Sequence, residues 1–162
     1  MANKGLDEIF LSICEEFNKA GIQYVIIGGF AMIIHGYPRL TTDIDFFVNP
    51  SEENVMRIKK SLFKIFKDKT IEKLNVIDIK KYSVVRYVSE NGFCIDFIGK
   101  IGKIFEFSDV KNEVEMIEIE NVKIPVCSVE MLLRMKEKSV RPIDKQDVIF
   151  LREKIKYKSK NK

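Results

Sequence analysis

The stretch from Gly28 to Asp45 constrains the fold more than any other part of this 162-residue chain. A short apolar run stops at a pair of glycines, Gly28 and Gly29, and the stretch ends in Asp43 and Asp45, which lead into a second apolar run. Short apolar runs bounded by glycine and proline are typical of buried strands. The order therefore predicts a strand, a short helix and a second strand, at residues 22–27, 30–35 and 41–48.

Asp43 and Asp45 are two positions apart on the second expected strand, so their side chains share one face while Ile44 points to the core. Two carboxylates about 7 Å apart along a strand can converge on a hard divalent cation, Mg²⁺ or alternatively Mn²⁺. The glycine pair before the short helix offers backbone N–H groups that can hold a phosphate. Together with the nearby Arg39, these groups are the components that phosphoryl or nucleotidyl transfer requires.

The same residues resemble the nucleotidyltransferase superfamily whose best-known member is DNA polymerase β. The likeness is closest to its small stand-alone bacterial and archaeal members, including the nucleotidyltransferase toxins of abortive-infection systems. The family signature is Gly-Gly or Gly-Ser, a spacer, Asp-x-Asp, and a third acidic residue on a later strand; here the spacer runs from Phe30 to Thr42. The resemblance implies an NTP substrate and, for the toxin branch, an antitoxin or another protein partner.

The third acidic residue is expected from the run at 93–98, in which Asp96 is the only charged residue. A charge in such a run costs several kcal/mol unless it is paired or bound to metal. The alternative is that Asp96 faces solvent on an antiparallel sheet, but Cys94 and Ile98 would share its face. We therefore expect Asp96 to complete the metal site and to be catalytic together with the other two aspartates.

Arg39 and Thr42 come directly before the carboxylates and are expected at the nucleotide, where a guanidinium can bind the triphosphate. The alternative for Arg39 is a surface position, because Pro38-Arg39 suits a turn. His35 is expected to be structural, since histidine near the end of a helix commonly contacts the terminal carbonyls.

A second group of polar residues interrupts the apolar stripes after the expected sheet. Similar small nucleotidyltransferases carry a Leu-x-x-Lys…Arg-x-x-Asp-x-x-Asp run there. The resemblance implies that Lys136 binds phosphate and that Arg141 and Asp144 are accessory residues of the active centre. The alternative is structural: Asp144 leads a helix and pairs with Arg141, and Asp147 likewise has no chemical role.

Composition fits one globular domain, expected over 1–153, with 46% hydrophobic residues. No apolar run reaches the length of a membrane span, and the first residues lack the apolar region of a signal peptide, so a cytoplasmic protein is expected. Cys14, Cys94 and Cys127 are too dispersed for a zinc site in a chain with one histidine, and we expect them to be buried thiols.

The tail at 154–162 has lysine at every second position, although the net charge of the chain is only +4. The simpler interpretation is a solvated, disordered terminus. The alternative is an electrostatic contact with RNA or another anionic partner.

The remaining pattern predicts an α+β domain with a mixed, twisted sheet of about five or six strands and helices against it. Asn91-Gly92 and Glu120-Asn121 indicate hairpins, and Ser51 and Ser128 are expected helix caps. Helices are expected at residues 6–20, 51–66, 128–138 and 143–156. Further strands are expected at residues 73–79, 83–89, 93–98, 114–119 and 122–126.

These features predict a metal-dependent nucleotidyltransferase that moves a nucleoside monophosphate from an NTP to a hydroxyl of RNA such as tRNA, of a protein or of a small molecule. One alternative is a catalytically inactive module that binds a nucleotide or a partner. Another is an RNA-binding protein that depends on the basic tail. The presence of all three carboxylates favours the enzyme.

Overall fold

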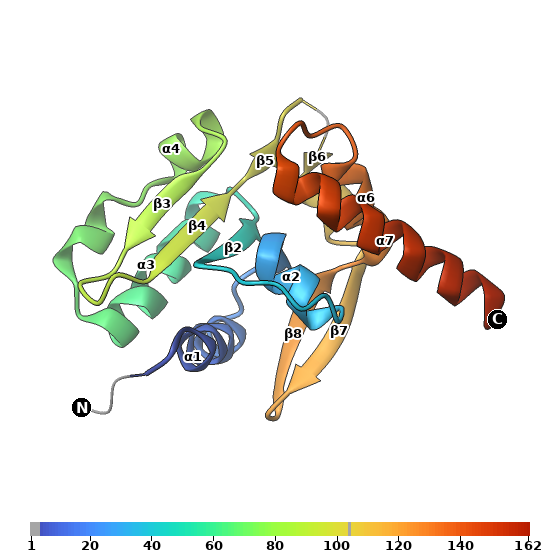
Figure 1. The fold of residues 1–162 in the computed structure, drawn as a ribbon. Helices are drawn as coiled ribbons and strands as arrows, with labels where there is room; N and C mark the ends of the chain where they lie inside the picture. Colours follow the sequence, from blue (N-terminus) through green and yellow to red (C-terminus); the bar gives the residue numbers. More distant parts are fainter. Residues whose placement is uncertain (1–3, 104) are drawn as a thin grey trace.

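A six-stranded mixed sheet organises the molecule, with the strand order β3-β4-β2-β1-β8-β7 (Figure 1). The computed structural model describes residues 4–103 and 105–162. The predicted α+β architecture is confirmed. The strands of this sheet are β1 (Tyr24–Ile27), β2 (Asp43–Val48), β3 (Val85–Val88), β4 (Cys94–Ile98), β7 (Val114–Ile119) and β8 (Val122–Cys127). A separate pair consists of β5 (Lys100–Ile101) and β6 (Phe105–Glu106).

Helices precede, interrupt and follow these strands. Those of the first half are α1 (Leu6–Lys19), α2 (Gly28–Ile34), α3 (Glu52–Phe66), the short 3₁₀ helix η1 (Lys69–Lys73) and α4 (Val76–Lys81). Those of the second half are α5 (Phe107–Val110), α6 (Val129–Lys136) and α7 (Pro142–Lys160). Figure 1 shows α6 and α7 together at one side of the molecule, with the C-terminal end of α7 extending away from the sheet. None of the described helices is both long enough and apolar enough to cross a membrane.

The central strand β2 is antiparallel to β1 and parallel to β4. Alternation along β2 gives the sheet two unlike faces. Ile44, Phe46 and Val48 are fully buried on one face, and Phe46 packs against Phe17 of α1 with ring centroids 5.0 Å apart. The two aspartates of β2 share the opposite face. The sheet core therefore fixes the direction in which these carboxylates point.

The two helices α1 and α3 form because their apolar residues recur at helical spacing, and side-chain caps begin α3 and α6. The Ser51 hydroxyl accepts a hydrogen bond from the backbone N–H of Asn54 (3.2 Å), and Ser128 does the same for Met131 at the start of α6 (3.1 Å). Both serine caps agree with the prediction. The stripe of α1 packs beside α3 and beneath the sheet.

The predicted strand at 73–79 is wrong, because this segment forms the end of η1 and the helix α4. The Asp68 side chain accepts from the backbone N–H of Thr70 (2.8 Å), and the Asn75 side chain accepts from that of Asp78 (2.8 Å). Each cap satisfies a backbone donor that has no partner inside the helix. Local capping thus outweighs the β-branched composition of the segment.

Both predicted hairpins form, and the geometry of the one between β3 and β4 matters for the site. Glu120 and Asn121 have positive φ angles of 48° and 68°, as the tight turn between β7 and β8 requires. In the other hairpin, Ser89 pairs with Phe93 across a three-residue loop that ends at Gly92, whose φ is +84°. This loop length sets the register between β3 and β4.

The basic C-terminal residues lie on a helix, since α7 continues to Lys160. The expectation of a disordered tail is therefore wrong for 154–160. Lys158 forms an ion pair with Glu115 (3.1 Å), so the row of lysines is not unopposed by acids. The cysteines are free thiols; Cys14 and Cys127 are buried as expected, but Cys94 is partly exposed.

Candidate active site

Three aspartates lie together on one face of the sheet, as the sequence predicts. Asp45 of β2 pairs in register with Asp96 of the parallel neighbour β4, and Asp43 is two residues earlier on β2. Adjacent strands lie about 4.8 Å apart, and alternate residues on one strand share a face. Asp96 is 5% exposed, whereas the side chain of Asp43 is 34% exposed. The carboxylates therefore run from a buried position to a solvent-accessible one.

Arg86 of β3 is the residue of this face that the sequence analysis missed. Its Nε and Nη2 donate to the two oxygens of Asp96 at 2.8 and 2.9 Å, and Nη2 also donates to Asp43 Oδ2 at 3.1 Å. β3 pairs with β4 so that Arg86 lies opposite Asp96. The signal was present in the sequence as a single cation in the apolar run at 84–88, opposite an apolar run with a single acid.

Asp45 differs from its two neighbours because its carboxylate has no ion-pair partner among residues 4–103 and 105–162. Burial raises the pKa of Asp45 to about 6, and the nearby charges of Asp96 and Asp43 act in the same direction. Lys136 and Arg86 lower this pKa, but less strongly. A nearby cation would therefore stabilise the ionised form of Asp45.

The two glycines before α2 have different structural reasons. Gly28 has φ +68°, and a Cβ built on it would lie 2.1 Å from Oδ2 of Asp45. A Cβ on Gly29 would lie 2.6 Å from Oγ1 of Thr41 and 3.3 Å from the Arg39 guanidinium. Gly28 therefore makes room for a carboxylate of the site, and Gly29 makes room for the loop before β2. Their predicted contact with phosphate stays a prediction.

Thr42 lies beside the carboxylates, with its Oγ1 donating to Asp43 Oδ1 at 3.1 Å. The hydroxyl of Thr41 donates to the backbone carbonyl of Asp43 at the same distance. Thr42 thus contacts the first carboxylate of β2 directly, whereas Thr41 holds the backbone of the same residue.

A second ion cluster joins the loop before β2 to α6 and α7. Asp147 is fully buried, and its Oδ2 contacts Nη1 of Arg39 at 2.5 Å and Nζ of Lys136 at 3.0 Å. Lys136 also bonds to Asp144 at 3.0 Å. Hydrogen bonds from Ser139 and Lys136 bring the pKa of Asp144 below its usual range, although burial alone raises it. The cluster is compatible with both interpretations of this motif. Its aspartates have a structural role, because they form buried ion pairs, and these ion pairs hold Lys136 in the lining of a pocket.

Arg39 is thereby directed to Asp147 and does not contact the three carboxylates of the sheet face. Arg141 is mostly exposed, with Nε 3.9 Å from Asp144. His35 is buried and its Nε2 lies 2.7 Å from the carbonyl of Cys127, which agrees with the structural role expected for it.

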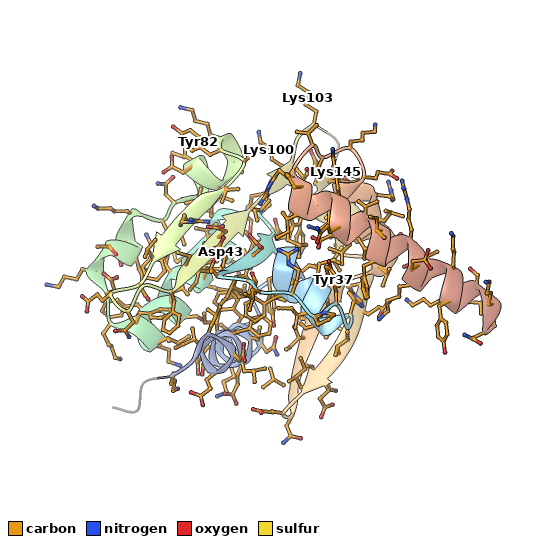
Figure 2. The ribbon with its side chains drawn as sticks, viewed as in Figure 1. Tyr37, Asp43, Tyr82, Lys100, Lys103 and Lys145 are labelled. Carbon is orange, nitrogen blue, oxygen red and sulfur yellow. The ribbon has the colours of Figure 1, made fainter. Side chains whose placement is uncertain are left out.

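A pocket of about 300 Å³ joins the sheet face to the second cluster. Its polar lining includes Asp45, Lys136, Arg141 and Asp144, and its apolar lining comes from β4, β5 and α6. Lys100 of β5 also lines it, and Figure 2 shows Lys100 and Lys145 above Asp43, near β5 and the start of α7. The pocket therefore combines carboxylates, cations and an apolar wall.

The carboxylates fit a divalent cation in type, because they are hard oxygen donors and Asp45 lacks a cationic partner. Within the described residues, however, no three His, Cys, Asp or Glu side chains are arranged to hold a metal ion. The reason is visible in the contacts, since Asp43 and Asp96 both turn towards Arg86. Convergence on a cation requires these side chains to rearrange.

The fold is shared with a solved structure of low sequence similarity. A crystal structure of a candidate nucleotidyltransferase from Thermotoga maritima matches with a TM-score of 0.56 and 14% identity, over 95% of this chain and 92% of the other. At this identity the match establishes the fold. No curated protein matches the sequence significantly.

A family model covers nearly the whole chain. The family described as "Nucleotidyl transferase of unknown function (DUF2204)" matches residues 7–161. This range includes the glycine pair, the three aspartates of the sheet face and the cluster between α6 and α7. The chain therefore belongs to this family of nucleotidyl transferases.

Proposed function

We propose that this protein uses a divalent cation to transfer a nucleoside monophosphate from an NTP to a hydroxyl acceptor. One observation carries the proposal: Asp45 and Asp96 pair in register, beside Asp43, and Asp45 also lines a pocket whose wall includes Lys100, Lys136 and Arg141. Family membership supports nucleotidyl transfer in general. The cation and the acceptor, which is an RNA, a protein or a small molecule, belong to the proposal alone.

Asp43, Asp45 and Asp96 are the residues that would hold Mg²⁺ or Mn²⁺. When bound, such cations neutralise triphosphate charge and lower the pKa of the acceptor hydroxyl. Asp45 is central to this role because it has a raised pKa and no ion-pair partner in the described chain. The absence of a side chain at Gly28 keeps the Oδ2 side of Asp45 open.

In the proposed reaction, the acceptor oxygen attacks the α-phosphorus of the NTP. The bond from this phosphorus to the bridging oxygen breaks, and pyrophosphate leaves. The proton of the hydroxyl passes to the carboxylate of Asp96, whose oxygens retain free lone pairs beside their bonds to Arg86.

Lys136 and Arg141 are the cations of the pocket lining that would contact the triphosphate. The buried cluster keeps Lys136 close enough to influence the pKa of Asp45. Thr42 supports Asp43, and Arg39 acts from behind the site through Asp147. Lys136 and Arg39 were both expected at the nucleotide, but we assign them different roles: Lys136 would contact the triphosphate, and Arg39 would hold Asp147 in place.

The test is transfer of label from each α-labelled NTP, with Mg²⁺, to total RNA, lysate protein or small-molecule acceptors. We expect label transfer by the wild type and a loss of turnover of about 10³-fold or more in Asp96→Asn, with NTP affinity changed much less. Affinity is retained because Asp43 and Asp45 remain, whereas the acceptor loses its proton acceptor.

Equal turnover in the two proteins would remove Asp96 from the mechanism. Tight NTP binding without transfer to any acceptor would instead favour the nucleotide-binding module. An Asp109→Asn variant is the control, because Asp109 lies on α5 and caps the backbone N–H of Glu106 (2.8 Å) away from the three carboxylates.

A further inference from the structure

We propose that Arg86 is the internal counter-ion of the carboxylate face, and that it leaves Asp43 when a divalent cation is bound. In this role Arg86 lowers the cation affinity of the resting protein and sets the cation concentration at which the site fills. The inference rests on the proposed function, because it concerns the same carboxylates, but it assigns a role to a residue outside the family signature.

The contacts of Arg86 use the oxygens that a cation needs. The guanidinium engages both oxygens of Asp96 as a fork and reaches Asp43 Oδ2 with the same Nη2 atom. A planar fork of N–H donors matches a carboxylate in two places at once. Arg86 therefore occupies oxygens of Asp43 and Asp96 and leaves Asp45 without a cationic partner among the described residues.

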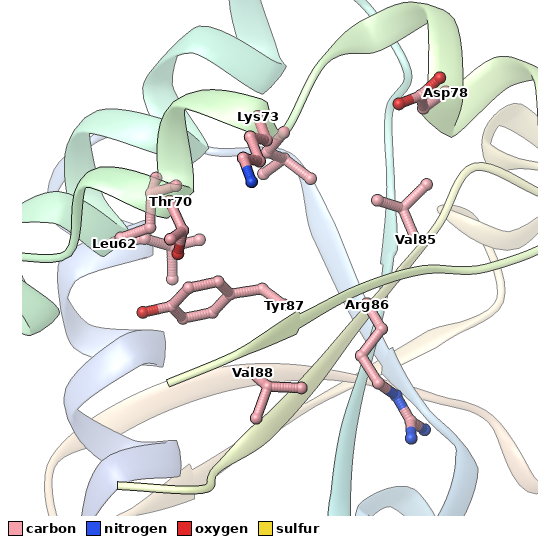
Figure 3. Close-up of a pocket in the computed structure, with 10 residues that line it drawn as sticks. Leu62, Thr70, Lys73, Asp78, Val85, Arg86, Tyr87 and Val88 are labelled. Carbon is pink, nitrogen blue, oxygen red and sulfur yellow. The ribbon is translucent and has the colours of Figure 1, made fainter. Parts of the chain in front are cut away.

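The arginine is the most exposed member of this group. β3 is the edge strand of the sheet, and the Arg86 side chain is 49% exposed, against 7% for Asp96. In Figure 3, Arg86 points away from Tyr87, which lies on the other side of β3 beside Thr70 and Leu62. Tyr87 anchors the strand through a hydrogen bond to Asp68 (2.8 Å). The strand is thus held in place while the guanidinium stays near solvent.

The charge balance shows that Arg86 neutralises the three carboxylates only in part. Three carboxylates face one guanidinium, and Asp45 receives no hydrogen bond from it. Coulomb repulsion between the carboxylates is offset in part by Arg86 and would be offset more fully by a divalent cation. Because cation and guanidinium need the same oxygens of Asp43 and Asp96, binding of one weakens binding of the other.

A different role for Arg86 makes the opposite prediction. If Arg86 only held Asp96 in a binding-competent position, its removal would weaken cation binding. If it competes with the cation, its removal strengthens binding, because a local positive charge is lost and the three carboxylate oxygens that it occupies become available. The sign of the change in cation affinity therefore separates the two roles.

The experiment measures Mn²⁺ binding by electron paramagnetic resonance of the free ion, without nucleotide, for the wild type and three variants. We expect Arg86→Gln to bind Mn²⁺ about tenfold more tightly, equivalent to about 1.4 kcal/mol. Arg86→Lys, which keeps the charge but loses the fork, should lie between the two. Arg57→Gln is the control, since Arg57 is similarly exposed and pairs with Glu53 on α3 (2.6 Å).

Weaker or equal Mn²⁺ binding by Arg86→Gln would overturn the inference and leave the proposed function standing. Absence of binding to every variant, with and without NTP, would overturn both. A wild-type measurement covers the case in which Arg86→Gln does not fold. Mg²⁺ should shift the Nε–H resonance of Arg86 in the wild type, and an unchanged resonance at saturating Mg²⁺ would refute the displacement.

Discussion

Two clusters of charged residues lie on either side of the same pocket, and they differ in charge balance and in burial. On the sheet face, two of the three aspartates, Asp43 and Asp96, pair with Arg86, whose side chain is half-exposed, and Asp45 has no ion-pair partner in the described part of the chain. Behind it, Asp147 and Asp144 are matched by Arg39 and Lys136, and Asp147 is completely buried. The first cluster has an excess of acid and an open side, whereas the second is closed.

This difference indicates which cluster is built to change. A buried pair that is balanced resists the loss of either partner, because a charge left alone is strongly destabilising. An acidic cluster with one half-exposed cation accepts a further cation instead. The second cluster thus holds Lys136 against the pocket, and the first offers carboxylates to what the pocket binds.

Breaking the closed cluster should have the largest effect on stability. We expect Asp147→Asn to lower the free energy of unfolding by about 3 kcal/mol, because Arg39 and Lys136 lose their shared buried carboxylate. Urea unfolding followed by circular dichroism measures the loss. One oxygen of Asp147, Oδ1, has no hydrogen-bond partner in the described structure, so the network is not fully satisfied even in the wild type.

A double-mutant cycle tests whether the pair is the cause. Arg39→Gln together with Asp147→Asn should cost less than the sum of the single changes, since the double variant leaves no guanidinium without its partner. Strict additivity would show that Arg39 and Asp147 are not coupled and that the comparison of the two clusters is mistaken.

Neutralising the acid excess should have the opposite sign and a smaller size. Burial and two carboxylates raise the pKa of Asp45 from its ordinary 3.8 to about 6. The folded protein therefore binds a proton at Asp45 more readily than the unfolded chain, and the ionised group reduces stability above pH 6. We expect Asp45→Asn to stabilise the cation-free protein by about 1–2 kcal/mol at pH 8, less than the full shift because solvent screens the group.

This gain should shrink as the pH falls from about 6 towards 4 and vanish below the ordinary pKa of the carboxyl group. Asp43→Asn is the matched control on the same strand face, because Asp43 has a cationic partner in Arg86 and its loss should bring no such gain. The measurement is urea unfolding in EDTA across this pH range. A pH-independent difference between Asp45→Asn and the wild type would contradict the assigned pKa.

The sequence was sufficient to identify the three aspartates. Strand alternation places Asp43 and Asp45 on one face, and Asp96 was expected from the family signature and as the only charge in its apolar run, whereas the parallel pairing of β2 with β4 is seen only in the structure. It was insufficient for Arg86, whose position depends on the length of one loop. A two-residue turn at Asn91-Gly92 would pair Arg86 with Phe97, whereas the observed three-residue loop pairs it with Asp96. A register shift of one residue moves every side chain to the other face, so this contact could not be derived from composition.

The second cluster shows the same limit from another side. The residue types of the motif after the sheet were recognised, but their contacts cross between distant parts of the chain. Arg39 precedes β2 and reaches Asp147 on α7, a pairing that no local pattern contains. The error at 73–79 had a local cause. The capping residue Asn75 was present in the sequence, but the strand was predicted from the apolar residues around it, whereas in the structure Asn75 caps a helix.

The smallest expected effect tests whether burial, and not distance, separates strong from weak pairs in this protein. Lys158 and Glu115 are 3.1 Å apart, almost the same as the 3.0 Å between Lys136 and Asp147. Their side chains are 39% and 40% exposed, whereas those of the second pair are 13% and 0% exposed. Water and salt screen the exposed pair, so Lys158→Gln should change the free energy of unfolding by no more than about 0.5 kcal/mol. Urea unfolding of Lys158→Gln and of Lys136→Gln compares the two pairs at nearly the same distance. If Lys158→Gln lowers the free energy of unfolding as much as Lys136→Gln does, burial does not distinguish the two pairs.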